Sequence, residues 1–557
     1  MRHRIKAHWK ASSGAPEFRA SAHQCPYAEY VSYLESRLHD SIQPWDRSLM
    51  RKRWARITRF SLAFVIATTA GCGQGPTTAP SSLQTLDPTH PSLRYTGRWD
   101  QQNPEAPWAG WAGSKVALGF VGSAAWVELD PGTNTEYFRV VIDSDPASSR
   151  KFEVTPGPGK YLLADNLASG PHTVEIIKET EYTDTAFLGF EVLGTGVTSK
   201  PKSRDRRIEF YGDSNLAGYS LEHENNQPGA QLEGTYFGYA GITARMFEAQ
   251  YHNISWSGST IPSVHAFFDR IDPASPAASW DFGRFQADVV VVNLGANDVG
   301  RPVAEIQADY HAFLDDLRAV HPAAHIVLFN AWGWSENEPA NYTHEVIASH
   351  DDPNMSAATF PWVFERWHGC EYDHGGMAVV LAEHLEEQLG WDAGPSDVMS
   401  GFGRNGDVAN GGFEETAPFG GYGWRYREDP GVRRRVDPEL AYAGQALLEL
   451  ADGAASHQPN PATGGDRVTL SFWARAPDGS ATVKATVDFR DQNMYSAPLI
   501  THSESFALGT EWQRIQIEAV APMDSPKPVF HTRVTLQAAE GSVVHVDEVE
   551  TTTRPTQ

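Results

Sequence analysis

The chain has 557 residues, of which 41% are hydrophobic and 21% charged, a composition typical of soluble globular proteins and not of disordered or fibrous ones. Its length allows three or four domains, each with its own core. With 70 acidic against 45 basic side chains and a net charge of −25, the chain is a poor candidate for nucleic-acid binding. Three cysteines and no Cys/His spacing typical of zinc predict neither a disulfide framework nor a zinc site.

The first 92 residues carry the pattern of an export signal and a tether. A basic stretch (51–60) is followed by an apolar or small one (61–70) and then by Cys72. This order predicts a lipoprotein signal peptide over residues 50–71, with Cys72 lipidated; the alternative is an ordinary signal peptide with an incidental cysteine. We interpret residues 1–49 as an upstream extension, with translation starting at Met50, and residues 72–92 as a flexible linker.

These segments predict where the protein works. We expect an exported bacterial lipoprotein of the cell envelope, held at the outer membrane through a lipid anchor at Cys72, or a secreted protein. We expect it to be a monomer that uses no cofactor.

Residues 93–199 contain short strand-like segments separated by Gly, Pro, Asp and Asn. Apolar and β-branched residues concentrate in segments 116–120, 125–129, 137–143, 160–163 and 172–177. Such spacing predicts an all-β domain, which we interpret as a β-sandwich of the jelly-roll kind.

Residues 200–395 alternate strands with amphipathic helices. Strands are predicted at 208–211, 251–256, 289–294 and 325–330, and helices at 236–249, 303–320 and 377–389. The alternation predicts a parallel sheet with helices on both faces, which binds ligands at the carboxyl ends of its strands. We expect residues 336–364 to form a long loop or an irregular insertion.

Residues 396–557 return to short alternating strands, among them 467–475, 512–517 and 543–549. We predict a second β-sandwich.

Four polar blocks lie in the loops of the central domain. The first, Gly212-Asp213-Ser214-Asn215, follows a buried strand and opens a helix, which is where an exposed nucleophile sits in many hydrolases. Taken alone it is also ordinary turn chemistry. The other blocks are 257–258, 295–298 and 371–374. Their joint occurrence favours catalysis, with Ser214 as the candidate nucleophile.

This order of blocks resembles the SGNH (GDSL-like) hydrolases. The resemblance implies that Ser214 is the nucleophile and His374 the base, and that the Ser214 N–H forms an oxyanion hole with Gly258 and Asn297. These enzymes commonly carry Asp-x-x-His-Pro at the histidine block, whereas here Glu371 holds the acid position and Gly375 replaces the proline. We expect Glu371 to orient the base, with Asp373 or a backbone carbonyl as alternatives.

The flanking regions resemble carbohydrate-active proteins. Segments 95–99, 141–143, 170–174 and 187–190 are similar to the N-terminal domain of the second family of carbohydrate esterases, which implies a polysaccharide deacetylase. Segments 410–414, 471–475 and 546–549 are similar to carbohydrate-binding modules of the fourth and ninth families, which implies glycan binding; a purely structural domain is the alternative.

Together these observations predict an acetyl xylan or mannan esterase that cleaves O-acetyl groups through an acyl-enzyme, with acetylated polysaccharide as its partner. Trp332 and Trp334 could stack on sugar rings or pack under a loop. The competing interpretations are an esterase acting on lipid or envelope-glycan esters and a non-catalytic glycan-binding protein.

Overall fold

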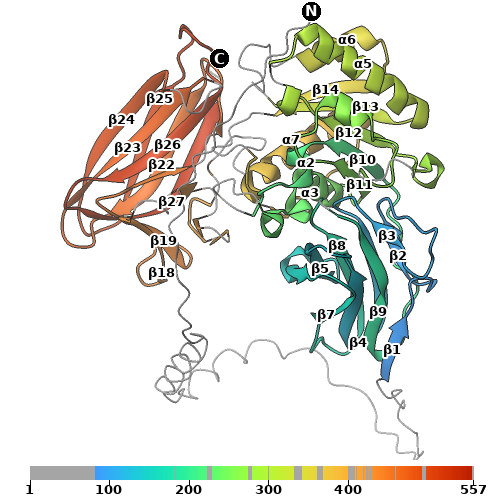
Figure 1. The fold of residues 1–557 in the computed structure, drawn as a ribbon. Helices are drawn as coiled ribbons and strands as arrows, with labels where there is room; N and C mark the ends of the chain where they lie inside the picture. Colours follow the sequence, from blue (N-terminus) through green and yellow to red (C-terminus); the bar gives the residue numbers. More distant parts are fainter. Residues whose placement is uncertain are drawn as a thin grey trace, which may run out of the picture. The chain divides into compact units, whose positions relative to one another are not determined.

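The computed structural model describes residues 82–554, apart from 182, 223–228, 274–278, 299, 332–341, 361–367, 399–407, 409, 415, 418–419, 422–423, 426–429, 458–459 and 492–496. Residues 50–71, which we predict to be a signal peptide, and Cys72, Trp332 and Trp334 therefore lie outside the described residues. Within these residues, no helix is both long and apolar enough to span a bilayer. Figure 1 shows an antiparallel N-terminal domain, an α/β central domain and an all-β C-terminal domain, so the multidomain organisation is confirmed.

The N-terminal domain is a nine-stranded antiparallel sheet ordered β1-β9-β4-β8-β5-β6, with β2 and β7 paired to β4 and β3 paired to β9. Its strands are β1 (Ser82–Leu86), β2 (Arg94–Thr96), β3 (Trp108–Ala109), β4 (Lys115–Asp130), β5 (Glu136–Ile142), β6 (Arg150–Val154), β7 (Gly159–Ala164), β8 (Pro171–Lys178) and β9 (Thr185–Val197).

Two features of this sheet differ from expectation. Strand β4 joins the two separate strands predicted at 116–120 and 125–129, because the break at Gly122 is a bulge against β9 and not a turn. Strand β1 lies in the segment expected to be a flexible linker: it pairs along its whole length with β9, and Leu86 is buried in the core. The Pro, Thr, Ser and Gln content of residues 72–92 therefore led us to predict a linker where the edge strand β1 lies.

The central domain is a five-stranded parallel sheet ordered β11-β10-β12-β13-β14. Its strands are β10 (Arg207–Gly212), β11 (Gln250–Ser255), β12 (Val289–Asn293), β13 (His325–Ala331) and β14 (Met355–Phe360). Its α-helices are α2 (Ser214–Ala217), α3 (Tyr239–Met246), α4 (Ile261–His265), α5 (Val303–Val320), α6 (Tyr342–His350) and α7 (Glu371–Leu389).

Four of these strands confirm the predicted ones. The region expected to be a long loop instead holds α6 and the edge strand β14, whose small side chains lack a clear strand pattern. Helix α7 begins six residues before its predicted start, which brings the whole histidine block into its first turn.

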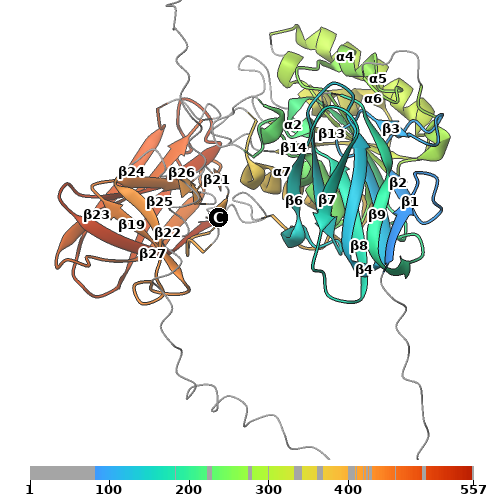
Figure 2. The same ribbon diagram turned by 60° about the horizontal axis from the view of Figure 1, so that its bottom comes forward.

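Helices cover both faces of this sheet, as the strand–helix alternation predicts. On one face Phe210, Val291 and Phe329 pack against α3 and α7. On the other face, Val292 and Leu328 pack against α4, α5 and α6. Figure 2 shows α4, α5 and α6 grouped on the opposite side of the sheet from α7. Because helices bury both faces of the sheet, the register of β10 is fixed, and with it the position of its last residue, Gly212.

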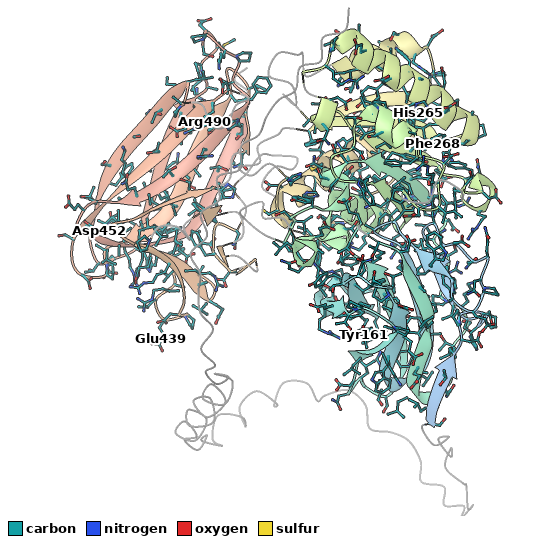
Figure 3. The ribbon with its side chains drawn as sticks, viewed as in Figure 1. Tyr161, His265, Phe268, Glu439, Asp452 and Arg490 are labelled. Carbon is teal, nitrogen blue, oxygen red and sulfur yellow. The ribbon has the colours of Figure 1, made fainter. Side chains whose placement is uncertain are left out.

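A buried charge cluster joins the N-terminal and central domains. The guanidinium of Arg98, which follows β2, donates to Glu209 of β10 at 2.9 Å, and both side chains are fully buried. Glu209 also contacts His252 Nδ1 at 3.2 Å and His321 Nε2 at 2.6 Å. Arg98 donates further to the carbonyl oxygen of Phe268, a residue labelled in Figure 3. Burial raises the pKa of Glu209, but Arg98 and the histidines outweigh it and hold that pKa well below its usual value.

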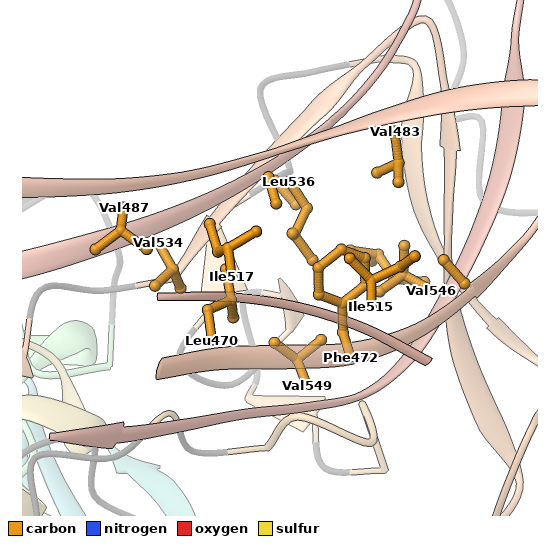
Figure 4. Close-up of a cluster of buried hydrophobic side chains, with 14 of the residues drawn as sticks. Leu470, Phe472, Val483, Val487, Ile515, Ile517, Val534, Leu536, Val546 and Val549 are labelled. Atoms are coloured by element: carbon orange, nitrogen blue, oxygen red, sulfur yellow. The ribbon is translucent and has the colours of Figure 1, made fainter. Parts of the chain in front are cut away.

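The C-terminal domain consists of a six-stranded and a five-stranded antiparallel sheet with a small hairpin. Side chains from both sheets form one core, shown in Figure 4, in which Val483 and Val534 of one sheet meet Leu470 and Ile517 of the other. Its strands are β15 (Thr416–Ala417), β16 (Gly420–Gly421), β17 (Trp424–Arg425), β18 (Val432–Val436), β19 (Ala446–Ala451), β20 (Ala454–His457), β21 (Asn460–Pro461), β22 (Arg467–Arg475), β23 (Ala481–Arg490), β24 (Ile500–Leu508), β25 (Gln513–Val520), β26 (His531–Ala538) and β27 (Val543–Arg554).

Replacing Arg98 by Met should lower the free energy of unfolding by about 3–5 kcal/mol, because Glu209 would keep a buried charge without its partner. Urea denaturation followed by tryptophan fluorescence measures this change. Arg467→Met is the control: Arg467 pairs with Glu518 where both side chains are nearly half exposed, so its loss should cost less than about 1 kcal/mol. Equal stability of Arg98→Met and the parent would contradict the importance of the cluster.

Candidate active site

Ser214 is the first residue of α2, two residues after the end of β10 at the carboxyl edge of the parallel sheet. A side chain at Gly212 would collide with Leu216, so the tight turn requires glycine there. Asp213 caps α2 by accepting the Asn215 N–H at 2.9 Å. Ser214 is only 7% exposed. The turn therefore holds its hydroxyl in one place.

The histidine that meets Ser214 is His368. Its Nε2 lies 2.8 Å from Ser214 Oγ, and its ring packs against Tyr219 with ring centroids 4.6 Å apart. Burial, with a smaller contribution from His374, lowers the pKa of His368 to about 4. At neutral pH its imidazole is therefore uncharged and able to accept a proton. A serine and a neutral histidine at this distance form the geometry of an activated nucleophile.

The structure does not bring His374 to Ser214, which corrects the contact implied by the family resemblance. His374 is fully buried in the first turn of α7, and the Tyr239 N–H donates to its Nδ1 at 3.2 Å. A backbone N–H can only donate, so Nδ1 is unprotonated and Nε2 carries the hydrogen. Nε2 donates to the carbonyl oxygen of His368 at 3.1 Å. His374 thus fixes the backbone that carries His368.

The two candidate acids also differ from expectation. Burial and then Glu222 raise the pKa of Glu371 to about 7, and Arg139 opposes them; no hydrogen bond joins Glu371 to His374 in the described part of the chain. Asp373 accepts the Cys370 N–H at 2.9 Å and so caps α7. Of the three alternatives for a partner of His374, the structure shows the backbone carbonyl.

The expected oxyanion residues lie on loops next to the serine turn. Gly258 has φ +79°, and a Cβ there would meet only open space. The side-chain amide of Asn297 donates to Asp213 at 3.1 Å and to the Ser259 carbonyl oxygen at 3.0 Å. Asn297 thereby links three of the four sequence blocks, because Asp213 belongs to the serine turn and Ser259 follows Gly258.

The N-terminal domain contributes a carboxylate to this region. Glu181, which follows β8, accepts the Ser257 N–H at 2.7 Å, directly before Gly258. Its side chain is 2% exposed, and burial raises its pKa to about 7. The loop that carries Gly258 is therefore anchored by a residue from outside the central domain.

Sequence reasoning missed both His368 and Glu181. His368 stands six residues before His374, and the family spacing directed attention to the later histidine; a second histidine so close by was the available signal. No sequence motif marks Glu181, because its contact with Ser257 depends on how the N-terminal and central domains pack. Among the residues that the structure describes, no group of three or more His, Cys, Asp or Glu side chains could hold a metal ion.

Comparison with known proteins matches both of these domains. Residues 95–201 match the carbohydrate esterase 2 N-terminal domain, and residues 210–360 match the GDSL-like lipase/acylhydrolase family. The chain is 30% identical over 338 residues to the cellulase/esterase CelE of Acetivibrio thermocellus, which covers 55% of this chain and 41% of CelE. The chain thus spans less than half the length of that relative.

Two further comparisons cover nearly the whole of the similar protein. An acetylxylan esterase/glucomannan deacetylase of Cellvibrio japonicus is 26% identical over 357 residues, which is 56% of this chain and 95% of that protein. The structure of a family two carbohydrate esterase from the same organism is 22% identical and covers 56% of this chain and 99% of that one, with a TM-score of 0.52; it supports the fold alone. The tandem of domains identifies residues 95–360 as an SGNH-type (GDSL-like) hydrolase unit with the N-terminal domain of the family 2 carbohydrate esterases.

Proposed function

We propose that the protein is a serine esterase that removes acetyl groups from polysaccharide, with Ser214 as nucleophile and His368 as base. The observation that carries this proposal is the 2.8 Å distance between Ser214 Oγ and His368 Nε2. Oγ attacks the ester carbonyl carbon while its proton passes to Nε2. The bond from the carbonyl carbon to the sugar oxygen then breaks, His368 gives its proton to that oxygen so that the sugar leaves with a free hydroxyl, and the acetyl-enzyme remains. In the second half of the reaction His368 takes a proton from water, and the water oxygen attacks the acetyl carbonyl carbon. Acetate leaves, and His368 returns the proton to Ser214 Oγ.

The oxyanion would be held by the N–H groups of Ser214 and Gly258 and by the side-chain amide of Asn297. A substrate oxygen would take one amide hydrogen of Asn297 from Asp213 or Ser259, its present acceptors. One such donor is worth about 10²–10³ in kcat. We assign the orienting role to His374 and not to Glu371, because His374 holds the His368 backbone.

The substrate class rests on the relatives. Two of them are named acetylxylan esterase/glucomannan deacetylase, which supports an acetylated xylan or mannan as the substrate. We further propose that both all-β domains are β-sandwiches, that the C-terminal one binds glycan, and that the protein is exported and anchored through Cys72 or secreted. The composition of residues 50–72 supports the export.

The full chain should release acetate from acetylated xylan, acetylated glucomannan and 4-nitrophenyl acetate, and Ser214→Ala should abolish the release. Enzymatic quantification of acetate measures it, and circular dichroism checks that the variant is folded. Release from 4-nitrophenyl acetate alone would keep the esterase but reject the polysaccharide. No release from any substrate by the folded parent would overturn the proposal.

His368→Ala should lower kcat by roughly 10²- to 10⁴-fold, the usual contribution of a general base. Added imidazole should restore part of this activity, because a small base can occupy the vacated space. His374→Ala should also lose activity, since the His368 backbone is released, but imidazole should not restore it. The exposed pair formed by His265 and Asp316 offers a control, and His265→Ala should retain full activity. Rescue of His374→Ala and not of His368→Ala would reverse the two assignments.

The acid limb of the pH profile should lie lower than for an ordinary histidine. The base must be neutral, and the pKa of His368 is lowered to about 4, so it stays neutral until the pH falls to that value. We expect kcat/KM to be constant from pH 7 to about 5 and to halve near pH 4, as measured with 4-nitrophenyl acetate on protein shown to be folded at each pH. A midpoint near 6.5 would contradict a buried base.

A further inference from the structure

A cavity of about 340 Å³ lies between the N-terminal domain and the central domain, away from Ser214. It is lined by strands β2, β4, β5 and β8, by the connecting segment at 201–204, by the end of α3 and by Gln250 and Tyr251. These two residues start β11, whereas Ser255 ends it at the catalytic edge. At about 3.3 Å per residue, Tyr251 lies roughly 13 Å from that edge. The cavity is therefore separate from the active site.

The lining of this cavity is strongly cationic although the chain as a whole is acidic. Against a net charge of −25 for the chain, the cavity gathers five basic side chains and one acidic one. They are Arg94, Lys115, Lys202, Arg204, Arg245 and Glu175. Walls of one charge sign around a concave space concentrate ligands of the opposite sign.

Part of this positive charge has no counter-ion in direct contact among the described residues, although Glu175 also attracts Arg204. Lys115 pairs with Glu175 at 2.8 Å, and Arg245 pairs with Asp397, whereas Arg94, Lys202 and Arg204 form no ion pair with any residue in the described ranges. Burial lowers the pKa of Arg94, as expected for a guanidinium that loses water without gaining a counter-ion.

Hydrogen bonds hold the Arg94 side chain and the backbone of Arg204. Arg94 Nε donates to the Pro201 carbonyl oxygen at 2.5 Å, and the Gln250 side chain donates to the Arg204 carbonyl oxygen at 2.7 Å. The connecting segment is thus fastened to the N-terminal domain at one point and to the central domain at the other. The ordered guanidinium of Arg94 reduces the entropy that is lost when a ligand binds to it.

Aromatic rings complete the lining. Tyr236 and Tyr251 face the cavity, and the Arg245 guanidinium lies 4.1 Å from the centre of the Tyr236 ring. Burial raises the pKa of Tyr236 to about 12, so its hydroxyl stays protonated. Rings of this kind offer an apolar face and a polar tip, which suits the alternating faces of a sugar ring. The volume falls in the range of about 300–1,000 Å³ found for small-molecule sites.

We propose that this cavity binds an anionic monosaccharide unit, with its carboxylate or phosphate group against Arg94, Lys202 and Arg204 and its ring beside Tyr236 and Tyr251. Nothing in the esterase chemistry requires this site. A free sugar acid, a sugar phosphate or an acidic sugar within a polysaccharide would all present this chemistry.

Isothermal titration calorimetry on the full chain tests the proposal. Ser214→Ala protein is used, so that turnover plays no part and failure of the esterase proposal leaves the test intact. The probes are glucuronate, glucose 6-phosphate, glucose and inorganic phosphate. We expect glucuronate or glucose 6-phosphate to bind, which also tells the carboxylate source from the phosphate source, and glucose to bind at least tenfold more weakly. Equal binding of glucose, equal binding of inorganic phosphate, or binding of neither anionic sugar would overturn the proposal.

Variants locate the binding. Arg204→Ala, on a segment fixed through its backbone, should weaken binding of the anionic sugar at least tenfold while the protein stays folded. Lys202→Ala, at an exposed position, is a second variant that should not disturb folding and should weaken it several-fold. Lys160→Ala removes a cation of the N-terminal domain that does not line the cavity and should leave the affinity unchanged. Undiminished affinity in both cavity variants would place the bound sugar elsewhere and reject this site.

Discussion

One fully buried carboxylate, Glu209, supports the arrangement of the two domains that form the hydrolase unit. It lies in β10, five residues before Ser214, and its charge is compensated by Arg98 from the N-terminal domain together with His252 and His321. An ion buried this deeply is tolerated only when its hydrogen-bonding groups are satisfied. The strand that precedes Ser214 is therefore tied to the N-terminal domain through this buried pair.

The hydrophobic pattern was sufficient to predict those strands that are buried on both faces of the sheet. Strand β12 begins with four successive valines, Val289 to Val292, because helices cover each side of the sheet. The same pattern failed to predict strands whose pairing with a neighbour outweighs the low strand propensity of their own residues. Gly122 interrupts the strand pattern without interrupting the strand, and Met355–Phe360 pairs with β13 although its small residues give little strand signal.

Part of the candidate site could likewise be predicted from the sequence, and part could not. Ser214, Gly258 and Asn297 follow strand ends whose convergence is a property of any parallel sheet, so the sequence order alone predicts that they lie close together. The choice between His368 and His374 depends instead on where α7 begins. A start at Glu371 buries His374 inside the first turn and leaves His368 on the preceding segment, facing the serine. The spacing of residues in the sequence does not predict where α7 begins, because its start depends on the capping of α7 by Asp373.

The contact of Glu181 with the Ser257 backbone has a consequence for modularity. The boundary between the first two domains, near residue 200, separates two hydrophobic cores but not two functions, because a loop of the second is anchored by a carboxylate of the first. Recombination at that boundary would transfer the serine and leave its loop without an anchor. The unit to move in protein engineering is therefore the N-terminal and central domains together, because the Glu181–Ser257 contact joins them.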